Sequence, residues 1–172
     1  VMGQYDTYTP LQLSQYITTL ANGKERLQPH FLKEVHEKTK NNDLGKVIYA
    51  PLKKVLNKID VDDIYINRVK EGFYAVTHAN YGIGHNYIDN KYDGAGKTGT
   101  SQSFIDTNND GVIDKETITT AFVGYAPKDN PKISIVVVSP SINNPHGYSE
   151  SVSQVTKRIS YQVTESYFSK HS

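Results

Sequence analysis

Ala95-Gly96-Lys97-Thr98-Gly99-Thr100-Ser101-Gln102 is the stretch that indicates most about the fold of this chain. It opens the first of three segments with the composition of β-strands, at residues 96–103, 117–126 and 132–139. Between the last two segments lies Pro-Lys-Asp-Asn-Pro, a tight-turn sequence, so these two should pair as an antiparallel hairpin. The apolar run within the last segment is typical of a strand that is covered on both faces.

Helical patterns precede these strands. Thr9 and Pro10 form a helix start signal and Asn22-Gly23 a stop signal, which together predict a helix over Pro10–Ala21. Apolar side chains at helical spacing predict a second helix within residues 62–77.

A third helix is predicted at the end of the chain, over residues 149–168. Its apolar stripe should lie on the sheet and consists of Val152, Val155, Ile159, Val163 and Tyr167. We also expect a strand near residues 31–35 and an exposed connection over residues 80–96. The predicted fold class is therefore α+β, with an antiparallel sheet flanked by helices.

Composition excludes several kinds of protein. The 172 residues include 19 basic and 18 acidic ones, so the net charge of +1 gives no bulk field for nucleic acid or a membrane surface. No segment approaches the roughly 20 apolar residues that cross a bilayer. Cysteine is absent, which excludes disulfides and thiolate metal sites. We therefore expect neither nucleic-acid binding nor a membrane span in this chain.

The Lys97-Thr98-Gly99-Thr100 segment has the chemistry of a substrate-binding strand. Because side chains alternate along a strand, Lys97 and Gly99 should point to one face and the two threonines to the other. Gly99 has no Cβ, so a peptide could lie against the strand there and add to the sheet through main-chain hydrogen bonds. The Thr100 N–H could then stabilise an oxyanion, and Lys97 could attract a carboxylate.

Two other interpretations of this segment exist. Lysine and threonine are common on ordinary edge strands, where they discourage pairing with other chains. Gly96-Lys97-Thr98 also matches the end of a phosphate-binding loop, but that motif needs a glycine where this chain has Lys91. A phosphate-binding loop must also continue into a helix, whereas the sequence beyond Gly99 has a strand pattern. We therefore reject the phosphate-binding loop.

The order of motifs resembles the C-terminal part of class B penicillin-binding proteins, their peptidoglycan D,D-transpeptidase domain. The similar segments cover nearly all of the chain: Gly3-Gln4, Thr9-Pro10-Leu11-Gln12-Leu13, Ala21-Asn22-Gly23 with Arg26 and Pro29-His30, Val69-x-x-Gly72-Phe73-x-x-Val76, Ala95 to Gln102, and Ala121-Phe122-Val123-Gly124-Tyr125-Ala126-Pro127. The chain departs from the family pattern at Lys24 or Glu25, in place of a glycine, and at Ala121, in place of a frequent aromatic residue. Several matches in the same order along the chain indicate a family far more specifically than a single motif does.

This resemblance implies a β-lactamase/transpeptidase-like fold and roles for residues of the Lys-Thr-Gly strand. Lys97 would act in the proton and charge network, and Thr98 and Thr100 would bind the carboxylate of D-Ala-D-Ala or of a β-lactam. The Thr100 N–H would form half of the oxyanion hole. Gly99 and Ser101 would complete the binding strand.

The nucleophile that the family uses is absent from this sequence. No serine has a lysine three positions later, although acyl transfer needs a nucleophile and its base together with the oxyanion hole. Ser141-Ile142-Asn143 contains the family's Ser-x-Asn pattern but follows the Lys-Thr-Gly strand instead of preceding it. We interpret it as a coincidental match in the turn after the last strand. Residues 1–172 would thus be a C-terminal segment without the nucleophile-bearing part, inactive by itself.

The resemblance also implies what the intact protein does. It would cross-link peptidoglycan stem peptides through a serine acyl-enzyme, bind β-lactams and require no cofactor. It would work at the outer face of the bacterial cytoplasmic membrane, through an anchor that this chain lacks. The alternative is a non-catalytic wall-associated module that binds peptide or calcium.

A second group of polar residues resembles a calcium-binding loop over residues 106–117. The oxygen ligands would come from Asp106, Asn108, Asp110, the Val112 carbonyl and Asp114, with Gly111 at the sharp turn. The glutamate expected at the twelfth position is missing, because Thr117 stands there and Glu116 lies one residue early. The alternative is a hairpin turn rich in Asp and Asn that binds no metal.

Overall fold

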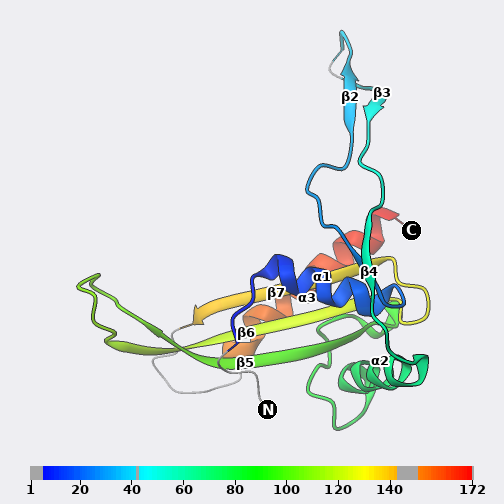
Figure 1. The fold of residues 1–172 in the computed structure, drawn as a ribbon. Coiled ribbons are helices and arrows are strands. Elements are labelled where there is room, and N and C mark those ends of the chain that lie inside the picture. The colour runs from blue at the N-terminus through cyan, green and yellow to red at the C-terminus, as the bar shows by residue number, and fades with distance from the viewer. Residues whose placement is uncertain (1–5, 42, 143–150, 172) are drawn as a thin grey trace.

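The main sheet has three antiparallel strands in the spatial order β5-β6-β7 (Figure 1). They are β5 (Ala95–Ile105), β6 (Lys115–Ala126) and β7 (Ile133–Ile142). The three predicted strands are thus confirmed, and each is longer than predicted. The structure is a computed structural model that describes residues 6–41, 43–142 and 151–171, without the side chains of residues 151 and 152. Continuous pairing from Ala95↔Tyr125 to Ile105↔Lys115 joins β5 to β6 as one long hairpin.

Helices cover both faces of this sheet. On one face lie α1 (Pro10–Ala21) and α2 (Asp63–His78), which bury Ile17 and Leu20 against Tyr125 of β6. On the other face lies α3 (Ser151–His171), which contacts β6 and β7. Among the described residues, none of the helices combines the length and the apolarity that crossing a bilayer would require.

Helix α1 begins and ends where the sequence predicts. The Thr9 hydroxyl accepts a hydrogen bond from the Gln12 N–H at 3.2 Å, and the Gln12 side chain accepts one from the Thr9 N–H at 2.8 Å. This reciprocal capping box satisfies two N–H groups that would otherwise lack partners at the helix start. Local signals are therefore sufficient to fix this helix.

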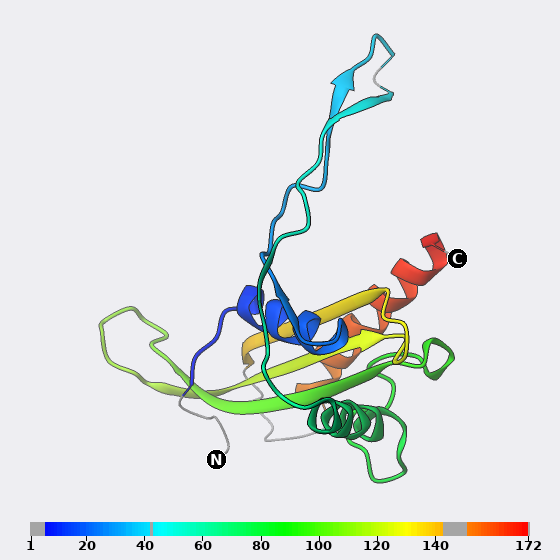
Figure 2. The same ribbon diagram turned by 45° about the vertical axis from the view of Figure 1, so that its right-hand side comes forward.

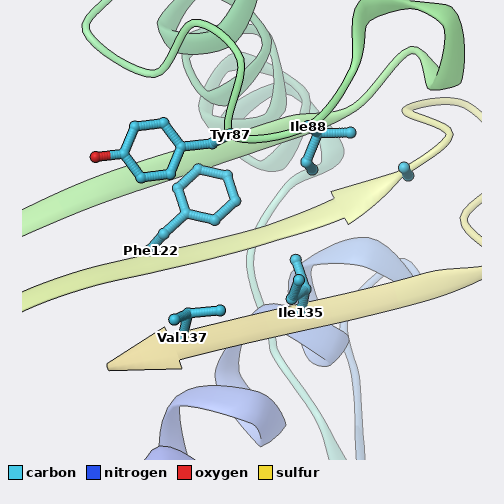
Figure 3. Close-up of a cluster of buried hydrophobic side chains, with 6 residues drawn as sticks. Tyr87, Ile88, Phe122, Ile135 and Val137 are labelled. Carbon is cyan, nitrogen blue, oxygen red and sulfur yellow. The ribbon is translucent and has the colours of Figure 1, made fainter. Parts of the chain in front are cut away.

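The core on the α3 face is built around Phe122, which is fully buried (Figure 3). Its ring stacks on Tyr87 with centroids 4.7 Å apart, and Ile135 and Val137 of β7 complete the cluster. Tyr87 and Ile88 are buried although they belong to the segment predicted to be exposed, residues 80–96. That prediction is wrong for these two residues and also for Gly84, Gly94, Ala95 and Gly96, which are buried as well. Among the many Gly, Asn and Asp residues of the segment, the apolar pair packs on the sheet.

Helix α3 lies on the sheet with a different face from the predicted one. Val155, Ile159 and Val163 are 38%, 39% and 45% exposed, whereas Thr156, Ser160 and Thr164 are fully buried. The hydroxyl of Thr156 contacts those of Thr120 at 2.6 Å and Ser139 at 2.8 Å, while Ser160 and Thr164 donate to carbonyls one turn earlier. Every buried hydroxyl on this face is thus satisfied, and small side chains let the helix approach the sheet closely.

Two small antiparallel sheets precede α2. They pair β1 (Glu25–Leu27) with β4 (Val55–Lys58), and β2 (Val35–Lys38) with β3 (Leu44–Tyr49). The β2–β3 hairpin projects away from the main sheet, as both views show (Figures 1 and 2). The strand predicted near residues 31–35 is wrong except at its last residue, because β2 begins at Val35.

Candidate functional site

The Lys-Thr-Gly segment lies on β5, an edge strand of the main sheet. Lys97, Gly99 and Thr100 are exposed, and Thr98 and Ser101 are half-buried. The Lys97 ammonium donates a hydrogen bond to the Thr98 carbonyl at 2.7 Å. The five predicted binding residues therefore lie together along a partly open strand.

The strand register separates these side chains onto two faces. Directly opposed residues of an antiparallel pair share a face. Lys97 opposes Val123, which packs against the α1–α2 core, whereas Thr98 opposes Phe122, in the core on the α3 side. The lysine and the threonines thus point to opposite faces of one strand, which is the alternation predicted from the sequence. Because β5 is a twisted edge strand, side chains from both faces can still border a ligand at its free edge.

The two glycines of this strand differ in the space around them. A Cβ on Gly96 would meet Phe122 Cε2 and the Val123 carbonyl oxygen, both at 2.7 Å. A Cβ on Gly99 would meet only Ala121 Cβ, at 3.8 Å, which is ordinary contact. The packing around Phe122 therefore requires glycine at position 96, whereas position 99 has room for the methyl group of an alanine.

This difference predicts opposite results for two identical substitutions. Gly96→Ala should lower the free energy of unfolding by about 1–3 kcal/mol, because the added methyl group forces Phe122 and the strand to move apart. Gly99→Ala should change it by less than about 0.5 kcal/mol. Urea unfolding of both variants checks the pair, and equal destabilisation would contradict the packing described for Gly96.

The chain leading into β5 is held from two directions. The buried Thr77 hydroxyl of α2 donates to the Gly94 carbonyl at 2.7 Å, and the Lys128 N–H of the β6–β7 turn donates to the Asp93 carbonyl at 2.8 Å. These non-local contacts fix the start of β5. The apolar pair Tyr87-Ile88 is a sequence signal that this segment packs on the sheet.

The acidic loop forms the tip of the β5–β6 hairpin and is exposed. Asp106 accepts hydrogen bonds from the N–H groups of Asn108 at 3.2 Å, Asp110 at 3.3 Å and Gly111 at 2.7 Å. Burial would raise the pKa of Asp106, but these N–H groups together hold it below its ordinary value. Asp114 accepts from the hydroxyl and N–H of Thr107 across the loop, which lower its pKa in the same way.

These contacts explain the acidic residues without a metal. Asn108 donates to Asp110 at 2.9 Å, and the Val112 N–H donates to Asp110 at 2.8 Å, so the side chains stabilise the turn itself. In the part of the chain that the structure describes, no group of three acidic or histidine side chains is placed to hold a metal ion. Calcium binding stays a prediction. Millimolar calcium should release heat and raise the melting temperature if it is right, and neither effect should occur if it is wrong.

Ser141 lies within β7, not in the turn after it as predicted. Strand β6 separates β7 from β5, so Ser141 is on the strand farthest from Lys97. Asn143, the other member of the Ser-x-Asn pattern, lies outside the described residues.

Comparison with known proteins confirms the family resemblance. Residues 2–165 match the family model described as the penicillin-binding protein transpeptidase domain. The chain is 40% identical over 169 residues to penicillin-binding protein 2A of Bacillus subtilis, covering 97% of this chain and 23% of that protein. It is 30% identical to the peptidoglycan D,D-transpeptidase MrdA of Haemophilus influenzae, covering 90% of this chain and 23% of that protein.

A solved structure agrees with the sequence relatives. Penicillin-binding protein 2B of Streptococcus pneumoniae strain 5204 superposes with a TM-score of 0.72 at 29% identity, over 98% of this chain and 24% of that one. The chain thus spans about a quarter of the length of these relatives. With a family match over residues 2–165 and an edge strand that carries Lys-Thr-Gly, the chain belongs to the transpeptidase family of the class B penicillin-binding proteins.

Proposed function

We propose that this chain is part of a serine D,D-transpeptidase that cross-links peptidoglycan stem peptides and is acylated by β-lactams. The family match over residues 2–165 carries the proposal. The relative named as a peptidoglycan D,D-transpeptidase, MrdA, supports the reaction class. The protein would act at the outer face of the cytoplasmic membrane, where its substrate is.

In this proposal β5 binds the substrate as an added strand. Gly99 lets the peptide or β-lactam approach the main chain, while Thr98, Thr100 and Ser101 lie along the same edge. The carboxylate of the ligand would bind the threonine hydroxyls, and the Thr100 N–H would stabilise the oxyanion of the tetrahedral intermediate. Lys97 would supply positive charge to the carboxylate and to the proton network of the nucleophile.

The attacking serine and its base would come from another part of the full-length protein, since no Ser-x-x-Lys occurs in this chain. Serine attacks the carbonyl carbon, its proton passes to the base, and the terminal D-alanine leaves as the amine accepts a proton. A β-lactam follows the same first step, but its leaving group remains attached through the opened ring. Exposure of Lys97 and Thr100 fits a strand that faces a second wall of the cleft.

Labelling with a fluorescent penicillin tests the proposal. The full-length protein should become covalently labelled, whereas the isolated chain should not, because it lacks the nucleophile. A full-length protein that resists labelling would instead favour a wall-associated module that only binds peptide. Covalent labelling of the isolated chain would contradict the assignment of the nucleophile to another part of the protein.

A further inference from the structure

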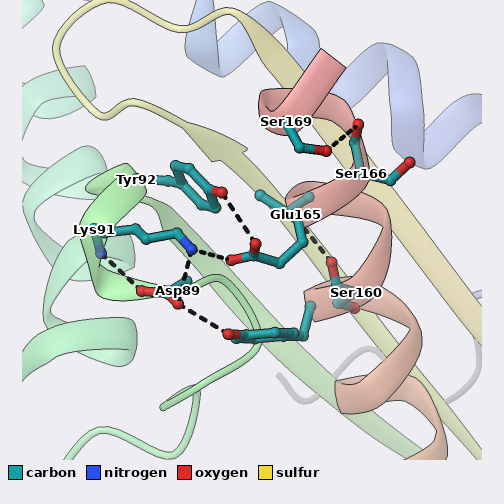
Figure 4. A network of polar contacts seen from close by, with 9 residues as sticks. Asp89, Lys91, Tyr92, Ser160, Glu165, Ser166 and Ser169 are labelled. Carbon is teal, nitrogen blue, oxygen red and sulfur yellow. Dashed lines mark hydrogen bonds and ion pairs between the residues drawn. The ribbon is translucent and has the colours of Figure 1, made fainter. Parts of the chain in front are cut away.

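A polar network joins the segment before β5 to α3 (Figure 4). From the segment come Asp89, Lys91 and Tyr92, of which the last two lie in the short helix η1 (Asn90–Tyr92). From α3 come Tyr161 and Glu165. We call these five residues the clasp.

Four contacts hold the clasp together. The Lys91 ammonium lies 2.7 Å from Glu165 Oε1 and 3.6 Å from Asp89 Oδ2. The Tyr92 hydroxyl donates to Glu165 Oε2 at 3.2 Å, and the Tyr161 hydroxyl donates to Asp89 Oδ2 at 2.9 Å. Glu165 therefore binds two residues of η1, and Lys91 binds two carboxylates from different elements.

Charge and stacking reinforce this geometry. The Glu165 carboxylate raises the pKa of Lys91, so the lysine stays charged. The Lys91 N–H and the Tyr161 hydroxyl hold the pKa of Asp89 below its ordinary value, so that carboxylate stays ionised. The Tyr92 ring stacks on Phe168 of α3 with centroids 4.3 Å apart.

The clasp lies close in sequence to the substrate-binding strand. Strand β5 begins three residues after Tyr92, and its first two residues, Ala95 and Gly96, are buried. Asp93 and Gly94, which join η1 to β5, are also held by Lys128 and Thr77, so the clasp is a third attachment of the segment that leads into this strand. On this ground we propose that Lys91 and Glu165 are positioning residues, which act through η1 to set the place of β5 relative to the acylating serine.

This inference rests on the proposed function, because it assigns the clasp a part in acylation. The Lys91–Glu165 pair is half-exposed, with side chains 54% and 29% accessible, so it should contribute little to overall stability. Its larger effect should be on geometry, since a misplacement of about 1 Å can lower a reaction rate about 100-fold.

A second ion pair provides a matched control. Lys53 and Glu25 also lie 2.7 Å apart, with side chains 62% and 36% accessible. They join β1 to the start of β4, in a sheet separate from β5. Lys53→Met should therefore change stability about as much as Lys91→Met does, without moving β5.

The experiment compares these variants in the full-length protein. Lys91→Met and Glu165→Gln should each lower the rate constant of acylation by saturating fluorescent penicillin about tenfold, with little change in the apparent dissociation constant. Lys91→Arg keeps the cation and should restore most of the rate, and Lys53→Met should react like wild type. Hydrogen exchange at the amides of residues 96–98 should be faster in Lys91→Met and Glu165→Gln, but not in Lys53→Met.

The possible outcomes separate the inference from the function on which it depends. If wild-type protein is not labelled, the proposed function fails. If wild type is labelled and both clasp variants react at the rate of Lys53→Met, with unchanged exchange in β5, only the role of the clasp is overturned. Should Lys91→Met not fold, Glu165→Gln tests the same ion pair from α3.

Discussion

Lys97→Met should lower the rate of acylation of the full-length protein by penicillin at least about 100-fold. The substitution removes the positive charge that would attract the ligand carboxylate and assist proton transfer at the serine. It should leave the fold intact, because Lys97 is exposed and its ammonium bonds only the neighbouring Thr98 carbonyl in the part of the chain described. The melting temperature should therefore stay within about 2 °C of wild type.

Stopped-flow acylation and thermal unfolding on the same samples check this expectation. Lys46→Met is the matched control, because Lys46 is an exposed lysine on the β2–β3 hairpin. It should react at the wild-type rate. An acylation rate of Lys97→Met within threefold of this control would remove Lys97 from the catalytic machinery.

Phe122→Ala should cost about 3–5 kcal/mol of unfolding free energy. The ring is fully buried between Tyr87 and the strand neighbours Gly96 and Gly124, so its loss leaves a cavity at the centre of the sheet. Phe31→Ala makes the same chemical change at a side chain that is 90% exposed, and should cost less than about 0.5 kcal/mol.

Urea unfolding of the two phenylalanine variants measures the difference directly. A smaller loss for Phe122 than for Phe31 would mean that the core lies elsewhere. The two variants also report on the site, because the Phe122 ring lies against Gly96 of the Lys-Thr-Gly strand. Phe122→Ala should therefore also impair acylation in whatever fraction of the protein remains folded.

Elements fixed by local signals could be predicted from the sequence. The capping residues Thr9 and Gln12 determine the start of α1, and the turn sequence at residues 127–131 determines the β6–β7 hairpin. The edge position of Lys97 could also be predicted, since its motif precedes a hairpin in the chain and in the family order. For the helix start and the turn, the determining residues lie only a few positions apart.

The face of α3 could not be predicted in this way. Hydropathy favours Val155, Ile159 and Val163 as the buried stripe, yet Thr156, Ser160 and Thr164 are buried instead. A hydroxyl can be buried at little cost when it bonds a carbonyl one turn earlier or a partner on the sheet, as with Thr156 and Thr120. The hydrogen bond between Thr156 and Thr120 joins residues 36 positions apart. The spacing of apolar residues along the helix gives no information about such a partner.

The same limit applies to the candidate site. The residue types of the Lys-Thr-Gly strand indicate its chemistry, but nothing local distinguishes Gly96, which the core requires, from Gly99, which it does not. The Lys91–Glu165 contact likewise joins residues that are far apart in the chain. These features follow from packing across elements.

A crystal structure of the full-length protein acylated by a β-lactam tests the account most directly. The ligand should lie along the outer edge of β5, with its carboxylate about 2.7–3.2 Å from the hydroxyls of Thr98 and Thr100 and beside the Lys97 ammonium. The carbonyl oxygen of the acyl group should accept a hydrogen bond from the Thr100 N–H. A covalently bound ligand that makes no contact with residues 97–101 would contradict the central claim that this strand binds the substrate.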